Sequence, residues 1–264
     1  PRERLIAIIT NSFVPCNGRF PTIIAIISMF FVGSAAGLTQ TLLSTLILTG
    51  VIVAGVAMTL IMSKLLSRTL LKGEPSSFTL ELPPYRRPQI GKVIVRSILD
   101  RTLFVLGRAA AVAAPAGLII WIMANVTVSG ATLLSHCAGF LEPFAHLIGL
   151  DGVILMAFIL GWPANEIVVP IIIMAYMAAG SITDYTSLAS LKSLLVDNGW
   201  TWLTAICTII FSLMHWPCST TCITIKRETG RLKWTAAAFL LPTAAGCVIC
   251  FIVASVSRLL GLAP

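Results

Sequence analysis

The stretch "FSLMHWPCSTTCITIKRE", Phe211 to Glu228, begins like a membrane helix and ends like a cytoplasmic loop. Pro217 lies in its middle, where a proline removes one backbone hydrogen-bond donor and clashes with the preceding helical turn. The carbonyls around residues 213–214 therefore lose their partners, and the hydroxyl side chains at 219–221 can replace some of these bonds. This pattern predicts a helix that is broken inside a membrane.

The composition of the whole chain agrees with a membrane location. Of its 264 residues, 57% are hydrophobic and 11% are charged, whereas soluble globular chains carry about 25% charged residues. Apolar runs of roughly 20 residues, the length that spans a ~30 Å hydrocarbon core, recur along the sequence. We therefore predict an all-α fold, a polytopic integral membrane helical bundle with broken or re-entrant helices.

The net charge of +8 indicates membrane topology rather than a nucleic-acid partner. Nine of the 18 Lys and Arg lie between Lys64 and Arg108, whereas the segment 109–225 has five acids and a single base, Lys192. Such an asymmetry is the positive-inside signature, so we expect the basic regions to be cytoplasmic. The other basic clusters are Lys226, Arg227, Arg231 and Lys233, and, near the start, Arg2, Arg4 and Arg19.

A second interrupted segment, within 152–179, reads "ILGWPANEIVVPIIIMAYMAAG". If it and 201–225 both crossed the membrane, the basic run 226–233 would end outside, against its charge. If 152–179 instead turns back near Asn165, the basic run returns to the cytoplasm. We therefore predict one re-entrant hairpin and one crossing helix, unless 186–198 carries a further crossing.

The remaining segments follow from hydropathy and breaker residues. We expect spans at 22–36 and 38–63 around a Gly-rich turn, and further spans at 103–127 and 235–260. A polar basic connection at 64–88, an interfacial helix at 89–101 and an amphipathic stretch at 131–148 lie between them.

Two Pro-Cys pairs suggest metal binding. A freed carbonyl beside the sulfur of Cys218 would form a mixed sulfur and oxygen site, which suits a borderline divalent transition metal better than Mg²⁺ or Ca²⁺. Cys16 follows Pro15 in the same way, and "SFVPCNGRFPTI" echoes "MHWPCSTTCITI". Repeats with broken helices build midplane sites in many transporters. The alternative is a proline kink with a buried, inert cysteine.

Asn165 and Glu166 lie inside the second interrupted segment. An ionisable group in a membrane segment costs ~2.5–3.5 kcal/mol on insertion scales and marks a pathway by default. We expect Glu166 and the amide oxygen of Asn165 to serve an ion path. The alternative is that they cap the helix that starts near Ile167.

Three weaker candidates surround Cys218. Cys222 lies four residues later on the same helix face, although packing would also explain it. His215 is either a ligand or relay, or a histidine with satisfied hydrogen bonds, and Thr221 offers a hydroxyl oxygen.

Other features limit the classes of protein. The seven cysteines form no disulfide framework, and no phosphate loop, HExxH or GxSxG motif occurs, so we predict no enzyme and no nucleotide hydrolysis by this chain. Because the sequence starts at Pro1 without a signal peptide, we interpret it as the later part of a longer polypeptide.

Four pieces of the sequence resemble the bacterial ferrous iron transport protein B family: "RERLIAIITNSFVPCNGRFP", "LELPPYRRP", "GWPANEIVVPIIIMAY" and "WPCSTTCITIKRETGRLKW". The resemblance implies Gate modules on either side of a C-terminal-type region. We assign 1–37 to the end of the first Gate module, 38–101 to that region, and 102–264 to the second Gate module and a terminal span. One departure is Trp216 before Pro217, where the family leads us to expect a smaller residue.

The resemblance also implies a function and a set of partners. It implies inward transport of Fe²⁺ across the bacterial cytoplasmic membrane, with Cys16 and Cys218 contacting the ion and Asn165 and Glu166 supplying oxygen ligands. GTP would bind only to a domain outside this chain. Further expected partners are membrane lipid, small cytoplasmic iron-transport accessory proteins and a second copy of the protein, but no nucleic acid.

Three other functions compete with this one. The first is a Gate-type transporter of another divalent metal or a nucleoside, although a nucleoside site would favour aromatics and amides over Pro-Cys pairs. The second is a membrane enzyme with His215 and Cys218 as a base–nucleophile pair. The third is a scaffold that transports nothing.

Overall fold

The structure, a computed structural model, describes residues 2–32, 37–73, 89–177 and 187–262. Within these ranges the fold is helical apart from a β-hairpin of two-residue strands, β1 (Thr127–Val128) and β2 (Ala131–Thr132). This confirms the predicted all-α class. The first half of the expected Gly-rich turn and most of the basic connection 64–88 lie outside the described residues.

Three helical stretches are long and apolar enough to span a membrane in the part of the chain that the structure describes. They are α3 (Leu38–Arg68), α12 (Leu232–Leu259), and the stretch Trp202–Thr229, which consists of α10 (Trp202–Met214) and α11 (Ser219–Thr229). A proline-containing break at 215–218 separates α10 from α11, as the sequence predicts. At the start of the chain, α1 (Arg2–Thr10) is similarly separated from α2 (Phe20–Ile26), which continues as a π-helix to Val32.

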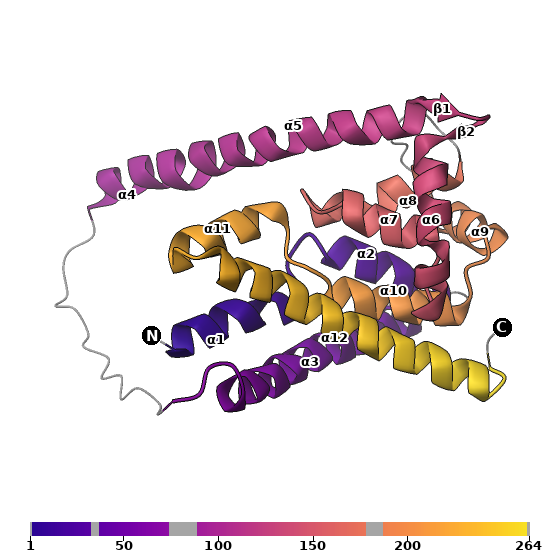
Figure 1. The fold of residues 1–264 in the computed structure, drawn as a ribbon, viewed down its shortest axis with the longest axis horizontal. Helices are drawn as coiled ribbons and strands as arrows, with labels where there is room; N and C mark the ends of the chain where they lie inside the picture. Colours follow the sequence, from indigo (N-terminus) through magenta and orange to yellow (C-terminus); the bar gives the residue numbers. More distant parts are fainter. Residues whose placement is uncertain (1, 33–36, 74–88, 178–186, 263–264) are drawn as a thin grey trace.

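The hairpin predicted for the second interrupted segment is present. Helix α7 (Gly152–Leu160) enters the bundle, the chain turns at 161–167, and α8 (Val168–Tyr176) returns beside α7 (Figure 1). The two outer ends are joined because Tyr176 Oη donates a hydrogen bond to Asp151 Oδ2, and Trp200 Nε1 donates to Tyr176 Oη at 2.8 Å. The preceding helix, α6 (Leu133–Leu147), meets α7 at 110°.

Protein covers this hairpin on most sides. Five consecutive side chains of α7, at 154–158, are buried, and Phe158 packs edge-on against Phe211 of α10 with ring centroids 5.0 Å apart. Non-helical backbone at membrane depth is tolerated only where protein or water covers it. The packing around α7 and α8 therefore permits the turn at 161–167.

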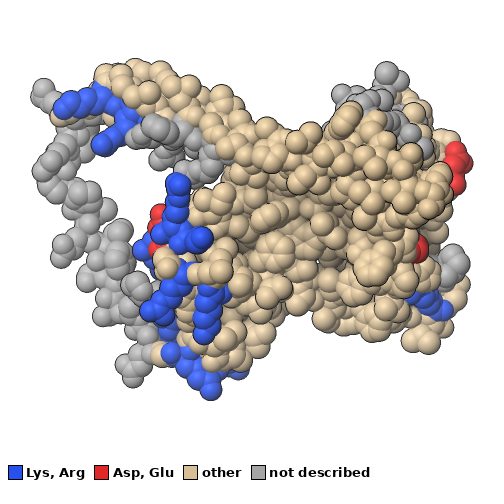
Figure 2. Space-filling view, turned by 45° about the horizontal axis from the view of Figure 1, so that its top comes forward, with Lys and Arg blue, Asp and Glu red and all other residues tan. Residues whose placement is uncertain are grey.

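The basic segments gather at one end of the molecule. Arg2 on α1 donates to the carbonyls of Ser67, in the last turn of α3, and of Leu71, just after it. Arg4 pairs with Glu228 on α11. Figure 2 shows Lys and Arg collected at this end, on the left, as the charge argument predicts. Helix α9 (Leu188–Asp197) has ten residues, about 15 Å of helix, which is too short for a further crossing.

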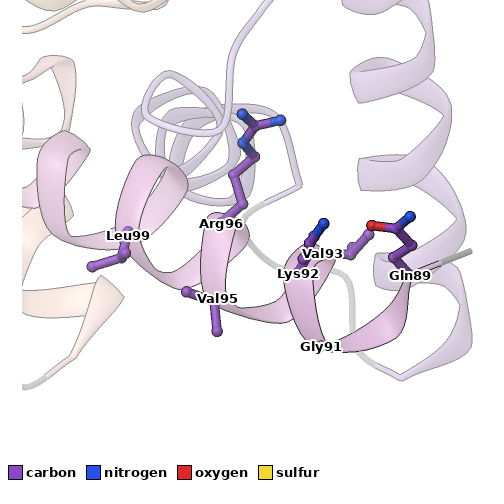
Figure 3. A pocket seen from close by; sticks show the side chains of 7 residues that line it. All are labelled: Gln89, Gly91, Lys92, Val93, Val95, Arg96 and Leu99. Atoms are coloured by element: carbon purple, nitrogen blue, oxygen red, sulfur yellow. The ribbon is translucent and has the colours of Figure 1, made fainter.

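The interfacial helix expected at 89–101 is not a separate element. Helix α4 (Ile90–Arg96) continues through a π-helical stretch to Leu103 and then into α5 (Phe104–Asn125). The backbone at Ser97 and Leu103 remains helical, and no proline interrupts this part of the sequence. In Figure 3, Lys92 and Arg96 point to one side of α4 and Val95 and Leu99 to another, around an open cavity of about 850 Å³.

Candidate ion site at three helix breaks

The three breaks in the helices meet inside the bundle. The backbone N–H of Ser219, which opens α11, donates to the carbonyl of Trp162 in the hairpin turn at 3.0 Å. Gly18, in the break between α1 and α2, lies against Glu166 of the same turn, and a Cβ atom at Gly18 would be 3.2 Å from the Glu166 carboxylate. Arg19, next in sequence, reaches the third break. The interruptions at 14–19, 161–167 and 215–218 therefore form one site.

Arg19 lies at the centre of this site and is only 3% exposed. Its Nη1 donates to the carbonyls of Ser12 at 2.8 Å and Leu213 at 2.9 Å. Its Nη2 donates to the carbonyls of His215 at 3.0 Å and Trp216 at 3.1 Å. The planar guanidinium, with its fork of donors, thus satisfies carbonyls that two helix breaks expose.

These bonds correct two sequence-based expectations. Arg19 was expected to belong to a cytoplasmic basic cluster, but it is buried among backbone carbonyls. The carbonyl of Leu213, freed by Pro217, was expected to face an ion, but it accepts a hydrogen bond from Arg19 instead. The sequence reasoning missed Arg19 because an arginine near other arginines resembles a topology signal. Its position three residues after Cys16, between Pro15 and Pro21, was the available clue.

Cys218 lies beside two hydroxyl groups. It is half-buried immediately before α11, with its Sγ 3.1 Å from Thr220 Oγ1 and 3.2 Å from Thr221 Oγ1. Cys16 is exposed. Cys16 is three residues before Arg19, and the guanidinium of Arg19 binds the carbonyl of Trp216, two residues before Cys218. The oxygen atoms next to Cys218 are therefore threonine hydroxyls rather than bare carbonyls.

Asn165 and Glu166 face different neighbours in the hairpin turn. Asn165 is buried, and its Oδ1 lies 3.4 Å from His215 Nε2, whereas Glu166 is exposed and lies against Gly18. Neither the short 3-10 turn at 165–167 nor the start of α8 has a side-chain cap hydrogen bond. The geometry thus gives no support to the capping role that was the alternative for these residues.

His215 is fully enclosed, and its ring nitrogens contact groups other than Cys218. Its Nδ1 lies 2.9 Å from the carbonyl of Ser212 and 3.1 Å from that of Phe211, and its Nε2 faces Asn165. Because carbonyls only accept hydrogen bonds, Nδ1 carries the proton, and Nε2 of the neutral ring is then an acceptor that pairs with Asn165 through the NH2 group of its amide. Both ring nitrogens are therefore engaged elsewhere, and the base–nucleophile pair of the enzyme alternative lacks its geometry.

Two further side chains near the third break are directed away from its polar side. The Trp216 ring stacks on Phe239 with centroids 5.4 Å apart and lines an apolar cavity of about 400 Å³ with Trp162. Cys222 is buried, and its Sγ donates toward the carbonyl of Pro217 at 3.6 Å. The unexpected tryptophan at position 216 therefore affects the apolar side of the break. Only the backbone carbonyl of Trp216 reaches Arg19.

The donors collected at the breaks are mixed. Residues 2–32, 37–73, 89–177 and 187–262 contain no group of three or more His, Cys, Asp and Glu placed to hold a metal ion. The breaks instead bring together thiols, hydroxyls, one amide and one carboxylate. Soft sulfur with neutral oxygen suits borderline divalent transition metals.

Comparisons with known proteins find similarity along nearly the whole chain. A family model described as "Ferrous iron transport protein B C terminus" matches residues 48–100, and one described as "Nucleoside recognition", the Gate domain, matches 106–232. A Staphylococcus aureus protein named "Fe(2+) transporter FeoB" is 27% identical over 98% of this chain. The chain therefore combines a match to the FeoB C-terminal region with a match to the Gate domain, and it is similar to a Fe(2+) transporter FeoB along nearly its whole length.

Two other proteins of this name also match most of the chain. Proteins of this name from Campylobacter jejuni and Helicobacter pylori are 24% and 22% identical over 98% and 91% of the chain. The chain spans between 37% and 43% of the length of these three relatives. No solved structure matches it. Cys218 and Glu166 fall inside the Gate match, whereas Cys16 lies before both matched regions. The division at 1–37, 38–101 and 102–264 remains a prediction.

Proposed function

We propose that this chain forms the membrane path through which a FeoB transporter carries Fe²⁺ into the bacterial cytoplasm. The observation that carries the proposal is the meeting of three helix breaks around the buried Arg19. Broken helices that converge near the middle of a bundle are how many transporters build a substrate site. The name of these relatives, Fe(2+) transporter FeoB, supports Fe²⁺ as the ion.

Each candidate residue has a role in this proposal. Cys16 and Cys218 are the soft ligands, and Asn165 and Glu166 supply oxygen ligands and negative charge. An ion must bind firmly enough to leave its hydration shell and weakly enough to move on. The fixed positive charge of Arg19, which binds carbonyls of the same break as Cys218, opposes overly tight binding of a cation.

Three neighbours have supporting roles. His215 orients the Asn165 amide, Thr221 provides a hydroxyl beside Cys218, and Cys222 packs against the break. None of these three side chains is proposed as a primary ligand.

The rest of the full-length protein supplies energy or gating. We propose a GTP-binding domain outside this chain, and catalysis of GTP hydrolysis belongs to that domain. Helix α4, with Lys92 and Arg96 at the basic end, would contact that domain or anionic lipid headgroups. Cytoplasmic accessory proteins and self-association are further proposed partners, and no position in the described ranges is assigned to them.

The test is uptake of radiolabelled Fe²⁺ by cells that express full-length variants at limiting iron. Cys218→Ser should lower uptake with unchanged membrane expression, and Cys137→Ser on α6, away from the breaks, is the matched control. Competition by Mn²⁺, Zn²⁺ and uridine separates Fe²⁺ transport from transport of another solute. Wild-type uptake in Cys218→Ser would refute the role of this thiol.

A further inference from the structure

A cavity of about 350 Å³ lies between α1 and α11 at the basic end of the molecule. The residues of α11 that line it recur at helical spacing, so one face of α11 is turned toward α1. Six of its nine lining residues carry a polar or charged side chain, although most of the exposed lining surface is apolar. The polar lining residues are Arg4, Asn11, Ser12, Thr221, Thr224 and Glu228.

The inner end of the cavity reaches the candidate ion site. Thr221 Oγ1 is 3.2 Å from Cys218 Sγ, and the carbonyl of Ser12 accepts a hydrogen bond from Arg19 Nη1 at 2.8 Å. The cavity is therefore continuous with residues of the first and third breaks.

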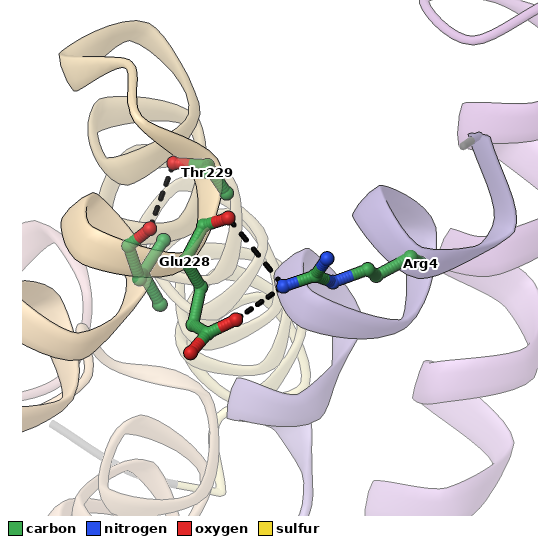
Figure 4. A network of polar contacts seen from close by, with 4 residues as sticks. Arg4, Glu228 and Thr229 are labelled. Atoms are coloured by element: carbon green, nitrogen blue, oxygen red, sulfur yellow. Dashed lines mark hydrogen bonds and ion pairs between the residues drawn. The ribbon is translucent and has the colours of Figure 1, made fainter.

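Arg4 and Glu228 lie at the outer end of the cavity, where they form an ion pair (Figure 4). Arg4 Nη2 pairs with Glu228 Oε2 and also lies 3.5 Å from the backbone carbonyl of Glu228. This is the only ion pair among the residues that the structure describes, and each side chain is 55% exposed. Ion pairs as exposed as this one contribute little to stability, so this one can open readily.

Glu228 occupies an unusual place for a carboxylate. It lies in the last turn of α11, where the helix dipole favours a cation and disfavours an acid. Its neighbours Lys226 and Arg227 follow that preference. The side-chain carboxylate and the C-terminal carbonyl of Glu228 together favour a cation at this spot, and the guanidinium of Arg4 occupies it.

We propose that this cavity is the cytoplasmic exit of the ion path and that Glu228, at its mouth, is a cation-binding carboxylate. When no ion is passing, the guanidinium of Arg4 occupies the cation's position on Glu228. The inference rests on the proposed function. A divalent cation that arrives from Cys218 along the threonine side chains of α11 displaces Arg4 from Glu228. The ion then leaves into the cytoplasm, and the return of Arg4 blocks re-entry of cations.

Binding of Tb³⁺, a luminescent probe of carboxylate sites, tests the cation site without transport. Trp234 packs against the cluster that contains Ile225, a residue that lines the cavity, so we expect it to sensitise the probe. In the full-length protein, Arg4→Gln should bind one more Tb³⁺ than the wild type, and Arg4→Gln/Glu228→Gln should lose it. Arg227→Gln, which removes a neighbouring charge outside the cavity lining, should leave Tb³⁺ binding unchanged.

Fe²⁺ flux into proteoliposomes completes the test. Glu228→Gln should reduce the flux several-fold, and Arg4→Gln should increase the backward leak of Fe²⁺ from preloaded vesicles. Wild-type flux in Glu228→Gln together with no added Tb³⁺ in Arg4→Gln would overturn the inference. If the Tb³⁺ pattern holds while the wild type carries no Fe²⁺, the proposed function fails and the cation site at Glu228 stands.

Discussion

Arg19 Nη1 donates a hydrogen bond to the carbonyl of Leu213 at 2.9 Å and so joins two broken helices that are 194 residues apart in the chain. Unpaired backbone groups at membrane depth cost several kcal/mol each. With four carbonyl partners, the guanidinium offsets this cost for both breaks and fixes them side by side. The position of Cys16 relative to Cys218 therefore depends on Arg19.

Substitution of Arg19 should impair both stability and transport. Hydrogen bonds to charged groups contribute about 1.5–3 kcal/mol each, so their loss should cost several kcal/mol. Lysine keeps the charge but lacks the fork of donors, so Arg19→Lys should be intermediate and Arg19→Gln worse. Thermal unfolding in detergent and Fe²⁺ uptake should both follow this order. Lys64→Gln, an exposed charge on α3, is the control, and wild-type stability of Arg19→Lys would contradict the account.

The contact between Gly18 and Glu166 predicts coupled effects. A Cβ at Gly18 would lie 3.2 Å from both Cγ and Oε1 of Glu166, so Gly18→Ala should displace the carboxylate. We expect Gly18→Ala and Glu166→Gln each to lower Fe²⁺ uptake, by about tenfold, or ~1.4 kcal/mol. The double variant should lose little more than either single one, because both act on one carboxylate.

The control for this pair is Gly139→Ala, since nothing lies within 4 Å of a Cβ there. Alanine is also the better helix former, so α6 should retain its stability. Fully additive losses in the Gly18 and Glu166 variants would show that the two positions act separately.

Tyr176 should secure the outer ends of the hairpin. Tyr176→Phe removes the hydrogen bond to Asp151 and the acceptor for Trp200, while Asp151 still caps α7 through the N–H of Ile154 at 2.6 Å. The expected loss is ~1–3 kcal/mol of unfolding free energy, because buried polar groups lose partners. A thermal melt of purified protein measures it, with Tyr176→Trp as a bulky comparison. An unchanged melting temperature would mean that these bonds do not hold the hairpin.

The sequence predicts the breaks but not how they are joined. Pro163 and Pro217 locate two interruptions in the helices. The basic segment 226–233 is expected in the cytoplasm, so the number of membrane crossings requires that one interrupted segment turn back as a hairpin. The burial of Arg19 does not follow from local rules, because the carbonyls that the guanidinium binds are nearly 200 residues away in the sequence. Continuity of α4 with α5 was missed because Lys92 and Arg96 suggested an interfacial helix, whereas the chain offers nothing to end the helix after them.

The central claim is that Cys16 and Cys218 bind one ion together. X-ray absorption of Fe²⁺ bound anaerobically to the full-length protein counts its sulfur ligands directly. We expect the Fe²⁺ ion in the wild type to have two sulfur ligands and additional oxygen ligands. In Cys16→Ser and in Cys218→Ser we expect one sulfur ligand. A sulfur count that neither substitution changes, or an ion bound by oxygen and nitrogen alone, would contradict it.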